Sequence, residues 1–139
     1  MADVFISYSK SRKAETIDLA TELEGRGFVV WWDKEIAAGE TFRDVIRAEL
    51  ERARAAIVIW TPASVKSNWV ISEATRAQRR GILIAVRSAD LHVDDIPAPF
   101  DVLHTELVTD RPAVLTALTK LGVMPSATPS KNDPKACIR

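Results

Sequence analysis

A tryptophan and a glutamate stand four residues apart, as Trp69 and Glu73, in the segment 67–73. On a helix, residues four apart lie on one face, one turn from each other. The segment follows a short apolar run, residues 56–60, that predicts a buried strand. If the helix follows a parallel strand, its first turn lies near the carboxyl edge of the sheet, where open α/β folds bind ligands. The pair therefore predicts a carboxylate and an aromatic wall at a ligand-binding position.

The motifs of several common α/β ligand sites are missing. The sequence contains no GxxxxGK[ST] phosphate loop, no GxGxxG after the first predicted strand and no GxSxG elbow. The positions where a receiver domain has acidic residues hold Ser7-Tyr8-Ser9 and Trp60-Thr61. His92 and His104 lack a Cys/His cluster at metal-ligand spacing, so we expect no metal site.

The elements that must position this pair follow from the apolar pattern. We expect strands at residues 4–9, 28–32, 56–60 and 82–86, and a weaker edge strand within 101–107. We expect helices at residues 13–26, 42–54, 68–78 and 112–121, with Thr41 and Ser67 as N-caps of the second and third. Alternating strands and helices call for a parallel sheet covered on both faces. Right-handed crossovers favour a flavodoxin-like, doubly wound α/β fold with five strands in the order 2-1-3-4-5.

The composition is typical of one soluble domain. The chain has 139 residues, of which 47% are hydrophobic and 27% are charged, which is enough for a sizeable core. Basic and acidic residues number 19 each, so we expect no nucleic acid and no membrane as partner. A single cysteine, Cys137, suits a cytoplasmic protein without disulfides. No apolar run approaches the roughly 20 residues of a membrane span, and no signal-peptide pattern is present.

Four stretches carry a family resemblance. They are residues 4–9, Val30-Trp31-Trp32-Asp33 with a loop ending in Gly39-Glu40-Thr41-Phe42, residues 56–64 with Ser67-Asn68-Trp69 and Glu73, and the apolar run 82–86. In this order and spacing the chain resembles the Toll/interleukin receptor (TIR) domain family over residues 1–123. Residues 124–139 are rich in Pro, Ser, Lys and Asp, so we expect them to form a flexible tail or linker.

The resemblance implies a chemistry for Glu73. Many TIR domains, particularly bacterial ones, cleave NAD+ at the nicotinamide–ribose bond, and their WxxxE pattern places the catalytic glutamate at Glu73. Nicotinamide leaves readily because bond cleavage neutralises its positive charge, and one carboxylate near the ribose can stabilise the oxocarbenium-like transition state. NAD+ is then a substrate, and no cofactor, metal or second carboxylate is required. The product is ADP-ribose, or a cyclic form if a ribose hydroxyl or an adenine nitrogen captures the cation.

Eight further residues are candidates for substrate binding: Phe5, Ser7, Tyr8, Trp32, Asp33, Lys34, Arg43 and Trp69. The first three lie at the carboxyl end of the first predicted strand, near the topological switch point. The next three start a loop that could cover the substrate, and Arg43, near a helix start, could meet a phosphate. Trp69 could wall the pocket or hold its helix in place.

Simpler interpretations also exist. An isolated helix glutamate is ordinarily a solvated surface residue, and Glu73 could pair with Arg76. The arginines that follow are then a solvated helix face: Arg76, Arg79, Arg80 and Arg87.

Two functions are compatible with the resemblance. The first is an NAD+ glycohydrolase that acts when TIR domains self-assemble, linked to a C-terminal sensor or oligomerisation domain, as in bacterial anti-phage defence. The second is a non-catalytic adaptor, or a mimic that disturbs host signalling, acting through TIR–TIR contacts alone. Glu73 favours the enzyme, because a pure adaptor has no chemical need for it.

Overall fold

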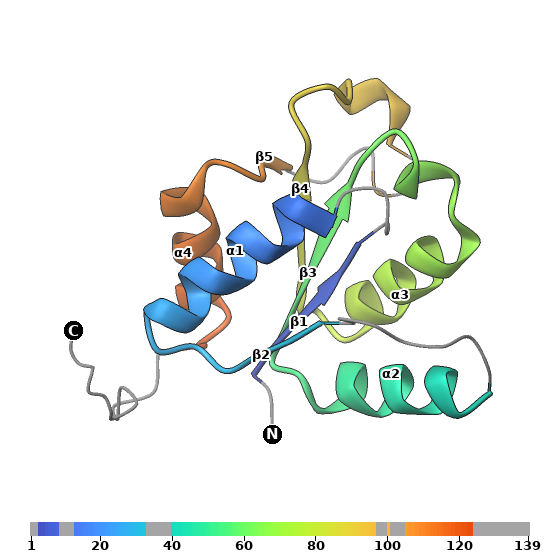
Figure 1. The fold of residues 1–139 in the computed structure, drawn as a ribbon, viewed down its shortest axis with the longest axis vertical. Helices are drawn as coiled ribbons and strands as arrows, with labels where there is room; N and C mark the ends of the chain where they lie inside the picture. The colour runs from blue at the N-terminus through green and yellow to red at the C-terminus, as the bar shows by residue number, and fades with distance from the viewer. Residues whose placement is uncertain (1–2, 9–12, 33–39, 97–99, 101–104, 124–139) are drawn as a thin grey trace.

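The computed structural model of the 139-residue chain describes residues 3–8, 13–32, 40–96, 100 and 105–123, with the backbone alone for 13, 40–45 and 93. Its centre is one sheet of five strands in the order β2-β1-β3-β4-β5 (Figure 1). The strands are β1 (Val4–Ser7), β2 (Val30–Trp32), β3 (Ala55–Trp60), β4 (Leu83–Arg87) and β5 (Glu106–Leu107). All neighbouring strands are parallel. The predicted flavodoxin-like order is therefore confirmed.

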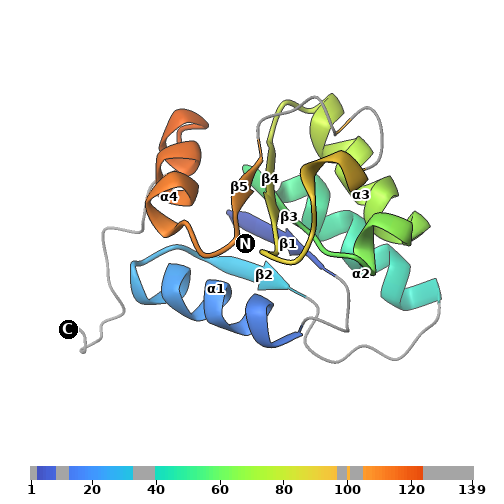
Figure 2. The ribbon, with the colours of Figure 1, turned by 90° about the horizontal axis from the view of Figure 1, so that it is seen from above.

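Two helices cover each face of the sheet (Figure 2). The helices α1 (Lys13–Gly25) and α4 (Arg111–Lys120) pack on one face. The helices α2 (Glu40–Arg52) and α3 (Asn68–Arg79) pack on the other. Short 3-10 helices, η2 (Ser64–Lys66) and η3 (Val93–Asp95), lie in the connections after β3 and β4. The sheet is doubly wound, as parallel strands joined by helices require.

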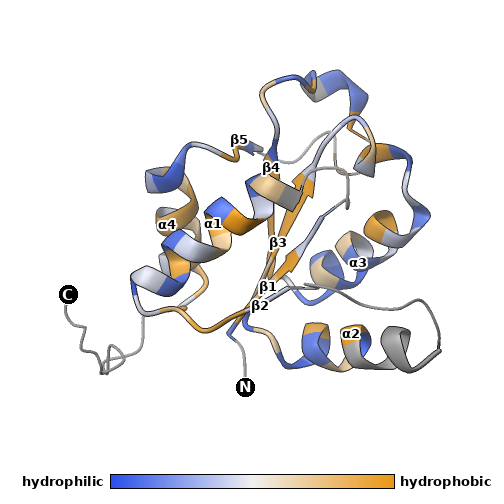
Figure 3. Cartoon of the chain, viewed as in Figure 1, coloured by the Kyte–Doolittle hydropathy of each residue, from blue (hydrophilic) through white to orange (hydrophobic). Residues whose placement is uncertain are grey.

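The central strand β3 packs its side chains into the apolar cores on both faces of the sheet. Ile57 and Ile59 pack with α1 and α4, whereas Val58 and Trp60 pack with α3. All six residues of β3 are buried, and each large apolar side chain contributes roughly 1.5–3 kcal/mol on burial. Figure 3 shows apolar residues along the central strands and mainly polar residues on the outer faces of the helices. Burial on both faces explains why this strand is an almost unbroken apolar run in the sequence.

The connection from β3 to α3 is a tightly bonded turn. The backbone N–H of Thr61 donates to Ser64 Oγ at 2.7 Å, and the N–H of Ser64 donates to Thr61 Oγ1 at 3.0 Å. The Ser64 hydroxyl also donates to the carbonyl of Ile59 at 2.9 Å. Ser67 then caps α3, because its Oγ accepts a hydrogen bond from the N–H of Val70 at 3.3 Å. The predicted Ser67 cap is confirmed, and these bonds set the first turn of α3 just beyond β3.

Some predicted boundaries are wrong. The helix α2 begins at Glu40, so Thr41 lies inside it and is not its N-cap. The strand β2 begins at Val30, two residues later than expected, because the N–H of Phe28 bonds to the carbonyl of Leu23 in the turn after α1. Gly27 makes this turn possible with φ 98°.

The strands β1 and β5 are shorter than predicted. The strand β1 ends at Ser7, and Ser9 lies outside the described residues. The strand β5 has two residues, and part of the predicted edge strand, residues 101–104, also lies outside the described residues.

The final helix, α4, starts with Asp110 as N-cap, whose carboxylate accepts a hydrogen bond from the N–H of Ala113 at 3.3 Å. The predicted tail, residues 124–139, is not described, so the boundary after residue 123 stays a prediction.

Candidate active site

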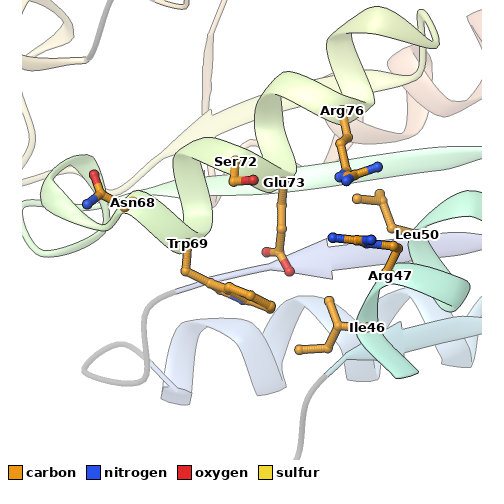
Figure 4. Close-up of a pocket in the computed structure, with 8 residues that line it drawn as sticks. All are labelled: Ile46, Arg47, Leu50, Asn68, Trp69, Ser72, Glu73 and Arg76. Carbon is orange, nitrogen blue, oxygen red and sulfur yellow. The ribbon is translucent and has the colours of Figure 1, made fainter. Parts of the chain in front are cut away.

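A pocket of about 350 Å³ lies between α2 and α3 (Figure 4). This volume is within the range of small-molecule sites. The pocket is lined by Ile46, Arg47, Leu50, Asn68, Trp69, Ser72, Glu73 and Arg76. Two residues predicted from the sequence, Trp69 and Glu73, are thus brought together in one cavity.

Glu73 is a buried acidic residue in this pocket. It is only 7% exposed, although glutamate is rarely buried unless it is paired. The hydroxyl of Ser7 donates a hydrogen bond to Glu73 Oε1. Burying a carboxylate costs free energy unless hydrogen bonds replace those to water. The interpretation of Glu73 as a solvated surface residue is therefore wrong.

Ser7 reaches Glu73 because of the alternation of side chains along β1. Phe5 and Ser7 point to the sheet face that α2 and α3 cover, whereas Val4 and Ile6 belong to the core beneath α1 and α4. Ser7 is 3% exposed and is the last residue of β1. Its position makes it a partner of the carboxylate, which is a different role from the substrate contact expected from the sequence.

Trp69 combines the two roles that the sequence left open. It lies in the first turn of α3, one turn before Glu73, and lines the pocket. Its ring is also half-buried against the core cluster that contains Phe5 and Ile46. Phe5 is 2% exposed and stacks on Trp31 with ring centroids 5.3 Å apart. Phe5 is therefore part of the core beneath the site and is not among the lining residues.

Tyr8 and Trp32 are not among the residues that line this pocket. Tyr8 and Trp32 pack in the core beneath α1 and α4, where their rings meet edge to face at 5.9 Å. Asp33 and Lys34 lie outside the described residues. Arg43 lies in α2, where only its backbone is described. The prediction that Tyr8 and Trp32 share a site with Glu73 is not supported, because the sheet separates them from it.

Sequence reasoning missed the wall that α2 contributes: Ile46, Arg47 and Leu50. One signal was available, because Arg47 follows Arg43 by four residues, and residues at this spacing lie on one face of a helix.

Arg76 was interpreted as a surface residue, although it follows Glu73 by three positions and so lies on the same face of α3. Its guanidinium lines the pocket and also lies 3.8 Å from the carboxylate of Glu51.

Arg80 holds the carboxyl end of α2 against α3. This C-cap residue of α3 donates hydrogen bonds to the carbonyls of Leu50 at 2.6 Å and Ala53 at 3.0 Å. Carbonyls at the end of a helix carry partial negative charge and favour a cation. Arg87 likewise donates to the carbonyl of Leu91 at 2.9 Å. Both arginines therefore bond to the backbone, while Arg80 stays exposed, as a solvated face implies, and Arg87 is half-buried.

The described residues hold neither a metal-binding cluster nor a helix suited to crossing a membrane. Within the described ranges, no three His, Cys, Asp or Glu side chains gather as they would around a metal ion. His92 lies 3.4 Å from Asp94, and both side chains are exposed. No helix in the same part of the chain combines the length and the apolar character that a membrane crossing needs.

Comparison with known families decides the classification. Residues 4–116 match the family model described as TIR domain. This chain belongs to the TIR domain family. The resemblance inferred from four short stretches is thereby confirmed, and the five-stranded parallel sheet is the fold of that family.

A curated relative of this TIR domain is bacterial. The chain is 41% identical over 69 residues to the 2' cyclic ADP-D-ribose synthase BtTIR of Bacteroides thetaiotaomicron. The match covers 48% of this chain and 24% of that protein, so the chain spans only about a quarter of the relative.

Solved structures share the fold at low sequence identity. The TIR domain of the Toll-related receptor TRR-2 from Hydra magnipapillata superposes with a TM-score of 0.69 and 18% identity, covering 88% of this chain and 96% of that one. A metazoan TIR-STING receptor from C. gigas, in complex with 2',3'-cGAMP, gives a TM-score of 0.72 and 23% identity, covering 85% and 39%. These likenesses establish the architecture alone.

Proposed function

We propose that this TIR domain cleaves NAD+ at the nicotinamide–ribose bond and that Glu73 is the catalytic carboxylate. The observation that carries the proposal is the placement of Glu73, which is 7% exposed in a pocket beside Trp69 and is bonded to Ser7. The bacterial relative, named a 2' cyclic ADP-D-ribose synthase, supports it. Cyclic ADP-ribose is what NAD+ becomes when nicotinamide leaves and the ribose carbon bonds within the same molecule.

Cleavage of the nicotinamide–ribose bond requires one negatively charged group close to the ribose. As the C–N bond breaks, its electron pair neutralises the pyridinium ring and positive charge develops on the ribose. The Glu73 carboxylate stabilises that charge, because a fixed charge in a site with little water acts strongly. Trp69 offers an aromatic face to the cationic nicotinamide ring before it leaves. Attack on the ribose cation by water gives ADP-ribose, and attack by a hydroxyl of the same molecule gives a cyclic product; in both cases the attacking oxygen loses a proton.

Ser7 acts as a positioning residue in this mechanism. Its hydroxyl donates to Glu73 Oε1 from a buried position at the end of β1. The bond joins the carboxylate to the last residue of β1, a strand in the interior of the sheet. The carboxylate is thereby oriented before substrate binds, which is how a preorganised site lowers a barrier.

Self-assembly is part of the proposal. TIR domains associate with one another, and we expect a second copy to complete the site on the first. Nicotinamide release should therefore rise more steeply than in proportion to protein concentration. A domain that is fully active as a monomer would show a rate strictly proportional to concentration.

The decisive experiment measures nicotinamide release by chromatography from NAD+ with the purified chain and with Glu73→Gln, across a range of protein concentrations. Release that disappears in Glu73→Gln supports the enzyme, and the same chromatogram separates ADP-ribose from cyclic products. Release that is unchanged in Glu73→Gln contradicts the assignment. If the wild-type chain releases no nicotinamide even at high concentration, the adaptor function is favoured instead.

A further inference from the structure

Two arginines from different helices line the same end of the Glu73 pocket. Arg47 comes from α2 and Arg76 from α3. Figure 4 shows both guanidinium groups in the gap between the helices, on the same side of the Glu73 carboxylate. Two positive groups placed together repel, and a doubly charged anion between them removes that repulsion.

The surrounding carboxylates leave this positive end largely uncompensated. Arg76 lies 3.8 Å from Glu51, but the two side chains are 42% and 60% exposed, so the pair contributes little in water. In the described part of the chain, no carboxylate lies within ion-pair distance of Arg47. Arg80, by contrast, donates its hydrogen bonds to backbone carbonyls and does not line the pocket.

The order of groups along α3 matches the order of groups in a nicotinamide nucleotide. Trp69, Glu73 and Arg76 occupy positions i, i+4 and i+7, which share one helix face. With a rise of about 1.5 Å per residue, Glu73 lies about 6 Å beyond Trp69 along the axis, and Arg76 about 4.5 Å further. An aromatic ring, a carboxylate and a cation thus follow one another. The nucleotide presents an aromatic cation, a ribose and a phosphate in the same order.

We propose that Arg47 and Arg76 bind the diphosphate of NAD+ and select the dinucleotide over nicotinamide riboside, which has no phosphate. This subsite rests on the proposed function, because the placement of nicotinamide and ribose at Trp69 and Glu73 fixes where the diphosphate lies. Guanidinium groups suit this task, since their planar donors form paired hydrogen bonds to phosphate oxygens. Arg47 and Arg76 are then binding residues that determine the substrate.

Binding and turnover test this subsite separately. Calorimetry with the Glu73→Gln chain compares NAD+ with nicotinamide riboside, alone and with Arg47→Ala, Arg76→Ala or both added. We expect each arginine change to weaken NAD+ binding about tenfold, the usual range for a lost hydrogen bond to a charged group, without affecting the riboside. In the chain that retains Glu73, the same changes should raise KM for NAD+ and leave kcat nearly unchanged.

Two control variants isolate the effect. Arg79→Ala removes an exposed arginine of α3 that does not line the pocket, so NAD+ binding should be unchanged. Glu51→Ala frees Arg76 from its ion pair and should leave NAD+ binding unchanged or tighter. Weaker binding after Glu51→Ala would mean that Arg76 acts through that pair, which contradicts the subsite.

The outcomes separate this proposal from the proposed function. Arginine-dependent NAD+ binding by a chain without turnover supports the subsite and rejects the enzyme. Turnover that depends on Glu73, with NAD+ affinity unchanged in the double arginine variant, supports the enzyme and rejects the subsite. Equal losses for NAD+ and nicotinamide riboside, or no NAD+ binding at all, also overturn the subsite.

Discussion

The hydroxyl of Ser7 donates a hydrogen bond to the carboxylate of Glu73, 66 residues further along the chain. The bond joins the last residue of the first strand to the middle of α3, across the face of the sheet on which the pocket lies. It ties the candidate catalytic group to the centre of the fold. Changes at either end therefore test the mechanism and the stability together.

Replacing Ser7 with alanine should reduce turnover more than binding. We expect Ser7→Ala to lower kcat for NAD+ about tenfold or more with little change in KM, because the carboxylate loses its orienting partner. The free energy of unfolding should also fall by about 1–3 kcal/mol, since a buried carboxylate is left with fewer hydrogen bonds. Steady-state kinetics and thermal melting measure the two effects.

Ser88 supplies a matched control for Ser7. It is also a buried serine, 1% exposed, and its hydroxyl donates to Asp90 at 2.6 Å, away from the pocket-lining residues. Ser88→Ala should lower stability without changing kcat of the folded protein. If both variants lose turnover in proportion to their loss of stability, Ser7 has no positioning role.

Replacing Glu73 with glutamine should abolish turnover and stabilise the fold. The amide keeps the shape and can still accept from Ser7, while the cost of burying a charge disappears. We expect a gain of about 1–2 kcal/mol in the free energy of unfolding, as often follows when an active site is neutralised. Chemical denaturation at neutral pH measures it. A clear loss of stability would instead assign Glu73 a structural role.

The effect of replacing Trp69 on KM and on stability should depend on the size of the new side chain. Trp69→Ala removes both the pocket wall and the packing against the Phe5 cluster, so KM should rise and stability should fall by about 2–4 kcal/mol. Trp69→Phe keeps an aromatic face and should recover most of the binding. Trp31→Phe, in the same cluster but outside the pocket lining, should lower stability alone. An equal KM change in both phenylalanine variants would contradict a substrate contact at Trp69.

Removing Arg80 should loosen the wall that α2 contributes. Arg80→Ala leaves the carbonyls of Leu50 and Ala53 without their charged donor, which should cost about 1–3 kcal/mol. Hydrogen exchange should then quicken at the carboxyl end of α2, whereas α1 should keep its protection. Exchange that accelerates equally in both helices would show a global loss of stability and not a local clamp.

The strands and helices could be predicted from the sequence because each is marked by a local pattern, and their alternation then favours one sheet order. The run 55–60 is apolar at every position, and Ser67 stands where a helix cap is needed. Trp69 and Glu73 were found for the same reason, since both lie on one helix. Arg47 was missed because its role depends on how α2 packs against α3. Tyr8 lies on the opposite face of the sheet from Ser7, because neighbouring residues of a strand point to opposite faces, and closeness in the sequence does not show this.

The division of the molecule by its sheet has an evolutionary consequence. The pocket is lined by α2 and α3, with Ser7 of β1 bonded to Glu73, whereas α1 and α4 lie on the opposite side of the sheet. Substitutions on those two helices reach Glu73 only through the strands between them. Substitutions on that flank can therefore accumulate with little effect on the geometry of the Glu73 pocket.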